Sequence, residues 1–174
     1  FKNYIQSYHS EVRLMYSVLT IADEILKHAK RLGRALTPMQ LNKIAYISQG
    51  SSLAMLQRPM FSDRIEAWKY GPVIPTLYQA TKKYGRAEIP ANLIDKDSPD
   101  ALDNDTQAFL KEVVEKYSHL TGVQLSSLTH RPGTPWYQVY EPNVMGKEIP
   151  THIISEHYLK ELDEYRQRIS ATSN

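Results

Sequence analysis

Apolar residues recur at helical spacing over residues 21–32, and this pattern predicts an amphipathic helix with one stripe facing a core. Thr20 is the expected N-cap of this helix, and the carboxylate of Asp23, three residues later, would bond to its free N–H groups. Gly33 follows the last apolar position, where a left-handed C-cap is favoured. The helix should therefore end at Leu32.

A second helix is predicted over residues 38–55. Thr37 is its expected N-cap, Pro38 stands in the first turn, and Gln40 completes a capping box. Apolar residues cover most of its circumference, which is typical of a buried central helix. Gly50 lies inside this helix, although glycine costs about 1 kcal/mol relative to alanine at such a position. We therefore expect Gly50 to pack closely against a neighbouring element.

Alternating residue types after position 60 predict a short extended segment near residues 63–70, and Gly71-Pro72 predicts a turn after it. The other expected elements are helices at residues 75–84, 106–119, 121–130 and 155–169, a loop at 86–104, a break at 131–135 and a frayed end at 170–174. The whole pattern predicts a mainly α fold, a compact single-domain helical bundle of about five to six helices with one short extended segment.

Composition narrows the class of protein. The 174 residues include no cysteine, which excludes disulfides, cysteine-based zinc sites and a cysteine nucleophile. The absence of cysteine also fits a reducing cytoplasm, where we expect the protein to act. No apolar stretch approaches the ~20 residues that a membrane span needs. Residues 1–14 differ from the patterned chain after them, so we expect a leader or expression-derived segment there and the domain at residues 15–174.

Histidine and serine are the candidates for chemistry. His152 and His157 are five residues apart, which does not place them on one helical face, so a metal site is not indicated. Ser127 and His130 could meet across a helical turn, but the sequence identifies no oriented base and no oxyanion hole. We therefore interpret His130 as a capping or loop-anchoring residue. No enzyme activity, metal or cofactor is expected.

Nucleic-acid binding is an alternative function. A helix ending at Leu32, a turn and a helix from Pro38 could form a helix-turn-helix, with Gln40, Asn42 and Lys43 facing the bases. The formal net charge is only +2, and the second helix is apolar where a recognition helix keeps a polar face. Nucleic acid is therefore not the expected partner.

Four blocks of the sequence match the pattern of a known family. They are LTPMQLNKIAYISQG at residues 36–50, FSDRIEAWKYGPVIP at 61–75, LSSLTH at 125–130 followed by Pro135-Trp136, and Ile149-Pro150 with the final helix. The second block is the most specific, because Trp, Tyr, Gly and two Pro fall at fixed offsets. Over about residues 16–165 the chain resembles the Panacea domain, the family of SocA-like antitoxins.

This resemblance implies an antitoxin of a toxin–antitoxin system, often encoded in a prophage, which neutralises a cognate toxin by direct protein–protein binding. An alternative is a proteolytic adaptor that delivers the toxin to a protease. The family is paired with many unrelated toxins, so the identity of the toxin does not follow from the resemblance.

The resemblance also selects candidate partner-binding or motif residues. Trp68, Tyr70 and Trp136 are of the types that dominate interface hot spots, although large aromatic residues also seal cores. The motif can therefore specify the fold while other surface specifies the toxin. The full set of candidates is Lys43, Tyr46, Gln49, Trp68, Tyr70, Gly71, Pro72, His130 and Trp136.

Overall fold

The protein is seen here in a computed structural model that describes residues 15–90, 93 and 101–173. The predicted leader at residues 1–14 and most of the second half of the predicted 86–104 loop lie outside the described residues. The mainly α prediction is confirmed: seven α-helices, one short 3-10 helix and a three-stranded sheet form within the described residues, against five to six predicted helices.

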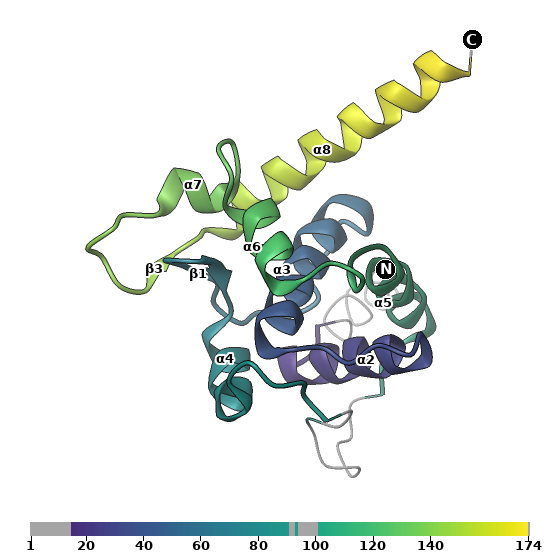
Figure 1. Cartoon of the computed structure of the whole chain (residues 1–174). Coiled ribbons are helices and arrows are strands. Elements are labelled where there is room, and N and C mark those ends of the chain that lie inside the picture. Colours follow the sequence, from purple (N-terminus) through teal and green to yellow (C-terminus); the bar gives the residue numbers. More distant parts are fainter. Residues whose placement is uncertain (1–14, 91–92, 94–100, 174) are drawn as a thin grey trace, which may run out of the picture.

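Most of the helices pack against one central helix (Figure 1). Their bounds are α2 (Val18–Arg31), α3 (Pro38–Met55), α4 (Pro75–Thr81) continued by the 3-10 helix η1 (Lys82–Tyr84), α5 (Asn104–Tyr117), α6 (Gly122–His130), α7 (Pro135–Val139) and α8 (Thr151–Thr172). None of the helices in the described part of the chain is long and apolar enough to cross a membrane.

The central helix is α3, as the sequence predicts. It contacts α2, α4, α5, α6 and α8 as well as the sheet, so apolar residues are needed on nearly every side of it. Its start follows the predicted capping box: the Thr37 hydroxyl accepts from the Gln40 N–H, and the Gln40 side chain accepts from the Thr37 N–H at 2.9 Å. The predicted bounds, residues 38–55, are confirmed.

The start of α2 differs from the prediction. Ser17, not Thr20, is the N-cap, and its hydroxyl accepts from the Leu19 N–H. Asp23 therefore lies inside the helix, where it is only 3% exposed and its carboxylate accepts from the Leu93 N–H at 2.9 Å. The capping interpretation of Asp23 is wrong, because the chain uses this carboxylate to hold a segment that is 70 residues away in sequence. At the other end, Gly33 has the predicted left-handed conformation, with φ +71°.

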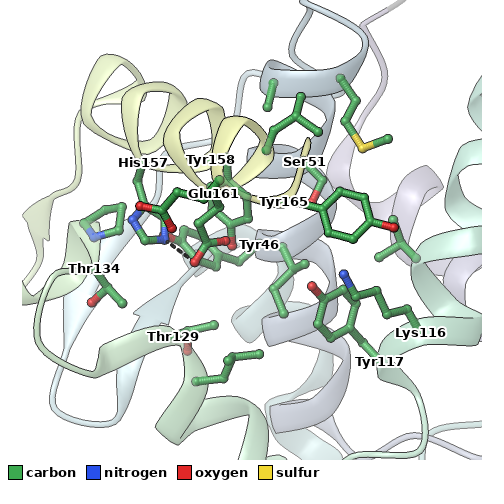
Figure 2. Close-up of a pocket in the computed structure, with 18 of the residues that line it drawn as sticks. Tyr46, Ser51, Lys116, Tyr117, Thr129, Thr134, His157, Tyr158, Glu161 and Tyr165 are labelled. Atoms are coloured by element: carbon green, nitrogen blue, oxygen red, sulfur yellow. Dashed lines mark ion pairs between the residues drawn. The ribbon is translucent and has the colours of Figure 1, made fainter. Parts of the chain in front are cut away.

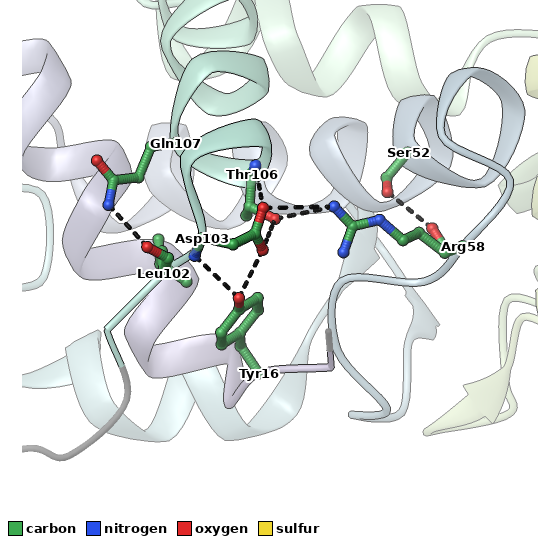
Figure 3. Close-up of polar contacts among 7 residues, drawn as sticks. All are labelled: Tyr16, Ser52, Arg58, Leu102, Asp103, Thr106 and Gln107. Carbon is green, nitrogen blue, oxygen red and sulfur yellow. Dashed lines mark hydrogen bonds and ion pairs between the residues drawn. The ribbon is translucent and has the colours of Figure 1, made fainter. Parts of the chain in front are cut away.

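A polar network fixes the start of α5, two residues before the predicted position (Figure 3). Asp103 is its N-cap and accepts from the Thr106 N–H at 2.9 Å and the Thr106 hydroxyl at 2.7 Å. The Tyr16 hydroxyl donates to the same carboxylate at 2.6 Å, and Arg58 lies 3.7 Å from it. Asp103 thus joins the N-terminus of α5 to the residues before α2 and after α3.

Two C-terminal elements differ from the prediction. The predicted break at 131–135 ends in a short helix, α7, because Thr134 caps it and Pro135 occupies its first turn. The last helix, α8, starts four residues earlier than expected, and the segment predicted to be frayed is helical to Thr172. At 22 residues α8 is about 33 Å long, and Figure 1 shows its C-terminal half extending away from the other helices.

The sheet is small and has the strand order β2-β1-β3, with antiparallel pairs. The extended segment predicted near 63–70 contains β1 (Glu66–Trp68), which pairs with β2 (Gly71–Val73) and with β3 (Lys147–Glu148). The turn lies at residues 69–70 rather than at Gly71-Pro72, which belong to β2. Pro72 is tolerated there because β2 is an edge strand, so the missing N–H leaves no ladder position empty.

Candidate functional site

Four buried polar side chains of α3 are bonded to the main chain of the segment that follows this helix. Asn42, Lys43, Gln49 and Ser52 lie in the core of the protein and are each at most 5% exposed, although their side chains are polar. Buried polar groups need hydrogen-bond partners, and these four find them on the backbone between residues 58 and 74.

The two amides each bond to a donor and an acceptor of the backbone. Gln49 donates to the Phe61 carbonyl at 2.7 Å and accepts from the Met60 N–H at 2.8 Å. Asn42 donates to the Ile74 carbonyl at 3.3 Å and accepts from the Ile74 N–H at 2.9 Å. A carboxamide can make such a pair of bonds because it carries both a donor and an acceptor, as a peptide group does.

Lys43 holds the strand β2. Its ammonium nitrogen donates to the Pro72 carbonyl at 2.7 Å, the side chain is 2% exposed, and none of the ion pairs among the described residues involves it. Burial lowers the pKa of Lys43 to about 7. Gly71 allows this approach: a Cβ there would lie 2.9 Å from Lys43 Nζ, and its φ of +113° is one that L side chains rarely adopt.

Two further helices hold the same hairpin by its carbonyl groups. The Trp136 indole N–H of α7 donates to the Trp68 carbonyl at 2.6 Å, and the Ser126 hydroxyl of α6 donates to the Tyr70 carbonyl at 2.5 Å. Every second carbonyl from residue 68 to residue 74 is thus bound by a side chain of a helix. We call these contacts the carbonyl clamp, formed by Trp136, Ser126, Lys43 and Asn42 on the carbonyls of Trp68, Tyr70, Pro72 and Ile74.

Most of the predicted candidates are therefore internal. Lys43, Gln49, Gly71 and Pro72 are buried, and Trp136 is 7% exposed. Packing and hydrogen bonds within the chain therefore explain why the motif contains these residue types. The structure brings these residues together, but it does not place them on the surface.

Three candidates reach the surface to different degrees. Tyr70, at the turn of the hairpin, is 61% exposed, with Lys69 against its ring. Trp68 is half-buried, donates to Glu66 at 2.7 Å and packs edge-on against Tyr78. His130 is also half-buried; its Nδ1 lies 2.5 Å from the Ser126 carbonyl. Ser126 lies one turn earlier in the same helix, α6, so this contact stays within the helix and does not hold a loop.

The helix-turn-helix alternative is not supported by α3. Asn42 and Lys43 are buried and bonded inside the chain. Gln40 caps its own helix and donates to the Leu120 carbonyl at 2.9 Å. These side chains are therefore not available to base edges.

A groove lies between α8 on one side and the end of α3 with α5 on the other (Figure 2). Its volume is about 840 Å³. Aromatic side chains form much of its lining, and charged groups of both signs stand among them. We call it the α8 groove. The residues that matter below are Tyr46, Met55, Val113, Tyr158, Glu161, Leu162, Tyr165 and Arg168.

The groove contains the ninth candidate, Tyr46. This side chain is 1% exposed, and its hydroxyl has no hydrogen-bond partner among the described residues. Burial, and then the charge of Glu161, raises the pKa of Tyr46. Glu161 itself bonds to His157 at 3.3 Å and lies 3.7 Å from Arg131. The hydrogen bond from His157 lowers the pKa of Glu161 more than burial raises it.

Sequence reasoning missed the α8 side of the groove. The predicted helix at residues 155–169 already contains Tyr158, Leu162, Tyr165 and Ile169, and their spacing is the signal that indicates an apolar stripe. In the described part of the chain, no group of three His, Asp or Glu side chains is arranged to hold a metal ion.

Comparisons with known proteins agree on one family. The family model described as "Antitoxin SocA-like, Panacea domain" matches residues 41–137, more than half of the chain. The protein named Antitoxin SocA from Caulobacter vibrioides (strain NA1000 / CB15N) is 28% identical over 124 residues, which are 67% of this chain and 66% of that protein. The chain thus spans about two thirds of the length of this relative. No solved structure matches the chain. The matched residues include all of the carbonyl clamp and end before α8.

Proposed function

The chain belongs to the family of SocA-like antitoxins with a Panacea domain, and we propose that it neutralises a cognate toxin by binding it directly, in the cytoplasm. The match over residues 41–137 supports the antitoxin role. The clamp supports a binding role for the remaining surface, because the motif residues are used to hold the fold and the exposed positions stay free for a partner.

The hairpin turn is the surface that we propose for the toxin. One observation carries this choice: the Tyr70 side chain is 61% exposed while its carbonyl is held by Ser126 at 2.5 Å. A large aromatic side chain on a backbone that is already fixed loses little freedom on binding. Half-buried Trp68 lies beside it in the same hairpin, and tryptophan and tyrosine are enriched at interface hot spots.

Co-expression with the product of the neighbouring gene tests this proposal. The antitoxin should restore growth and co-purify with the toxin. Tyr70→Ala should weaken the complex about tenfold or more, because a hot-spot truncation costs about 2 kcal/mol. Leu32→Ala, at an exposed apolar position at the end of α2, is the matched control and should have no effect.

Two results would contradict the proposal at different levels. If the toxin stays lethal with the wild-type chain present, direct neutralisation is wrong. If Tyr70→Ala binds and protects as the wild type does, the hairpin is not the contact surface. A proteolytic adaptor would instead lower the amount of toxin only when a protease is present, which immunoblotting of the toxin with and without that protease distinguishes.

A further inference from the structure

The apolar stripe of α8 continues beyond the part of the helix that packs on the protein. Tyr158, Leu162, Tyr165 and Ile169 are spaced by four, three and four residues, which is the spacing of the a and d positions of a heptad. At the start of the stripe the Tyr158 ring lies against Gly50 of α3, where an added Cβ would overlap the ring. The stripe therefore begins as a helix–helix contact inside the chain.

The second half of α8 presents the same stripe to solvent. All residues from 163 to 173 are exposed; Tyr165 is 56% and Ile169 47% exposed. Figure 1 shows this half of the helix standing clear of the other elements. A helix needs a partner for an apolar seam of this kind, since most helical stability in proteins comes from packing of the apolar face.

We propose that a second copy of this chain covers this stripe, with the two α8 helices antiparallel to each other. In this arrangement Leu162 of each copy packs against Tyr165 of the partner subunit. The contact uses the same surface on both copies, so it closes as a two-fold dimer. It does not depend on the antitoxin function.

Charge complementarity favours this partner. With Leu162 at position a of the heptad, Glu161 and Arg168 both fall at position g. Antiparallel pairing brings the g positions of the two helices together, so Glu161 of each copy faces Arg168 of the partner subunit. The interface thus gains two symmetry-related ion pairs, each between a Glu161 and an Arg168 of the partner subunit. A shift by one heptad would place Arg168 against Arg168 of the partner subunit, which disfavours that register.

The α8 groove favours the antiparallel orientation over the parallel one. Its second wall carries Met55, which is 54% exposed. In the antiparallel dimer the C-terminal end of each α8 runs back toward the groove of the other copy and covers this apolar side chain. A parallel pair would cover the stripe but leave both grooves open to water.

Sedimentation velocity of the full chain over a dilution series tests the proposal. The wild type should sediment as a dimer of the 20.0 kDa chain. Glu161→Arg and Arg168→Glu should each raise the dissociation constant about tenfold, because two attractive pairs become repulsive. Mixing these two variants should restore a tight one-to-one dimer, because in the mixture both pairs are again of opposite sign. Circular dichroism melting of each variant checks that the fold is intact.

The orientation and the occupant are tested by the same set of variants. Arg166→Glu should leave dimerisation unchanged, and mixing it with Glu161→Arg should not restore a tight one-to-one dimer. If that mixture does form a tight dimer, the helices are parallel and the proposal is overturned. A wild-type chain that is monomeric at all concentrations also overturns it. If such a monomer loses its toxin on Tyr165→Asp substitution, the stripe belongs to the toxin.

Discussion

Lys43 shows how a charged residue type can serve as a buried structural donor. Its partner is the Pro72 carbonyl, a neutral group, so no carboxylate compensates for the desolvation of the ammonium ion. Burial accordingly lowers its pKa to about 7, and near neutral pH a large share of the side chain carries no charge. A long, flexible side chain with several N–H donors can still reach the backbone in either state.

The pH dependence of stability should report on Lys43. Its pKa is about 7 in the folded protein against 10.5 for an unperturbed lysine, so between these values the unfolded chain binds more protons and stability rises with pH. The rise is at most about 1.4 kcal/mol per pH unit. Urea unfolding at pH 7, 8 and 9 should show this slope in the wild type and not in Lys43→Met. Equal slopes in the two proteins would contradict the assignment.

Gly71 is the residue that the Lys43 contact requires. Gly71→Ala should lower the free energy of unfolding by about 2–4 kcal/mol, since it adds backbone strain and a Cβ close to Lys43 Nζ. Gly85→Ala is the matched control, because Gly85 also has a positive φ but no atom lies within 4 Å of its Cβ position. Denaturant titration of both variants measures the difference, and equal losses would show that the close approach does not matter.

At the scale of elements, the contact between α3 and α8 depends on one small residue. Gly50 costs helix propensity in α3, but it lets the Tyr158 ring lie directly on the helix backbone. This confirms the sequence-based expectation that Gly50 packs closely against a neighbour. The position of α8, and with it the α8 groove, therefore depends on the absence of a side chain at residue 50.

Gly50→Ala should displace α8 even though alanine is the better helix former. The overpacked contact should cost about 1–3 kcal/mol. Hydrogen exchange should become faster in α8 and stay unchanged in α2, which has no part in this contact. A variant as stable as the wild type, with unchanged exchange in α8, would contradict this interpretation.

The cap of α5 should make stability sensitive to acid. Burial opposes ionisation of Asp103, but hydrogen bonds from Thr106 and Tyr16 outweigh it and hold its pKa below the ordinary aspartate value of 3.8. The unfolded chain therefore takes up the proton first, and the stabilisation present above pH 3.8 is lost as the pH falls through the lower, folded value. Asp103→Asn should lose stability at pH 6 and depend less on pH below 5, as thermal melts at several pH values can show.

Elements with local start signals were predictable, and elements that depend on distant partners were not. The Thr37–Gln40 capping box placed α3 correctly because its bonds lie within four residues. In contrast, β3 has only two residues and forms against β1, about 80 positions earlier. Asp23 has the sequence context of a cap, yet it bonds to Leu93. Such contacts leave no periodic trace in the sequence.

The candidate site was predictable in its residues but not in its role. The motif selected Lys43 and Trp136, which the structure brings to one hairpin, and Gln49, which bonds to Met60 and Phe61 ahead of that hairpin. Their acceptors are main-chain carbonyls, and a carbonyl group is the same at every position, so residue identity does not reveal which one is bound. The exposure of Tyr70 likewise follows from the turn at residues 69–70, two positions before the predicted one.

At the scale of the whole molecule, the carbonyl clamp joins α3, α6 and α7 to one hairpin, which favours cooperative unfolding. Both tryptophans of the chain take part, because Trp136 donates to the Trp68 carbonyl. Tryptophan fluorescence therefore reports on the clamp, and far-ultraviolet circular dichroism reports on the helices. The two unfolding curves in urea should coincide. A fluorescence change at lower urea than the circular dichroism change would show that the clamp opens before the helices unfold.

The carbonyl clamp also determines which residues of the hairpin can be substituted without loss of the fold. Because the helices hold the hairpin by backbone atoms, which every amino acid carries, the exposed side chains of Lys69 and Tyr70 contribute little to the anchoring. A library randomised at these two positions should keep its fold while its surface chemistry varies widely. The hairpin then acts as a stable platform for acquiring new binding specificities.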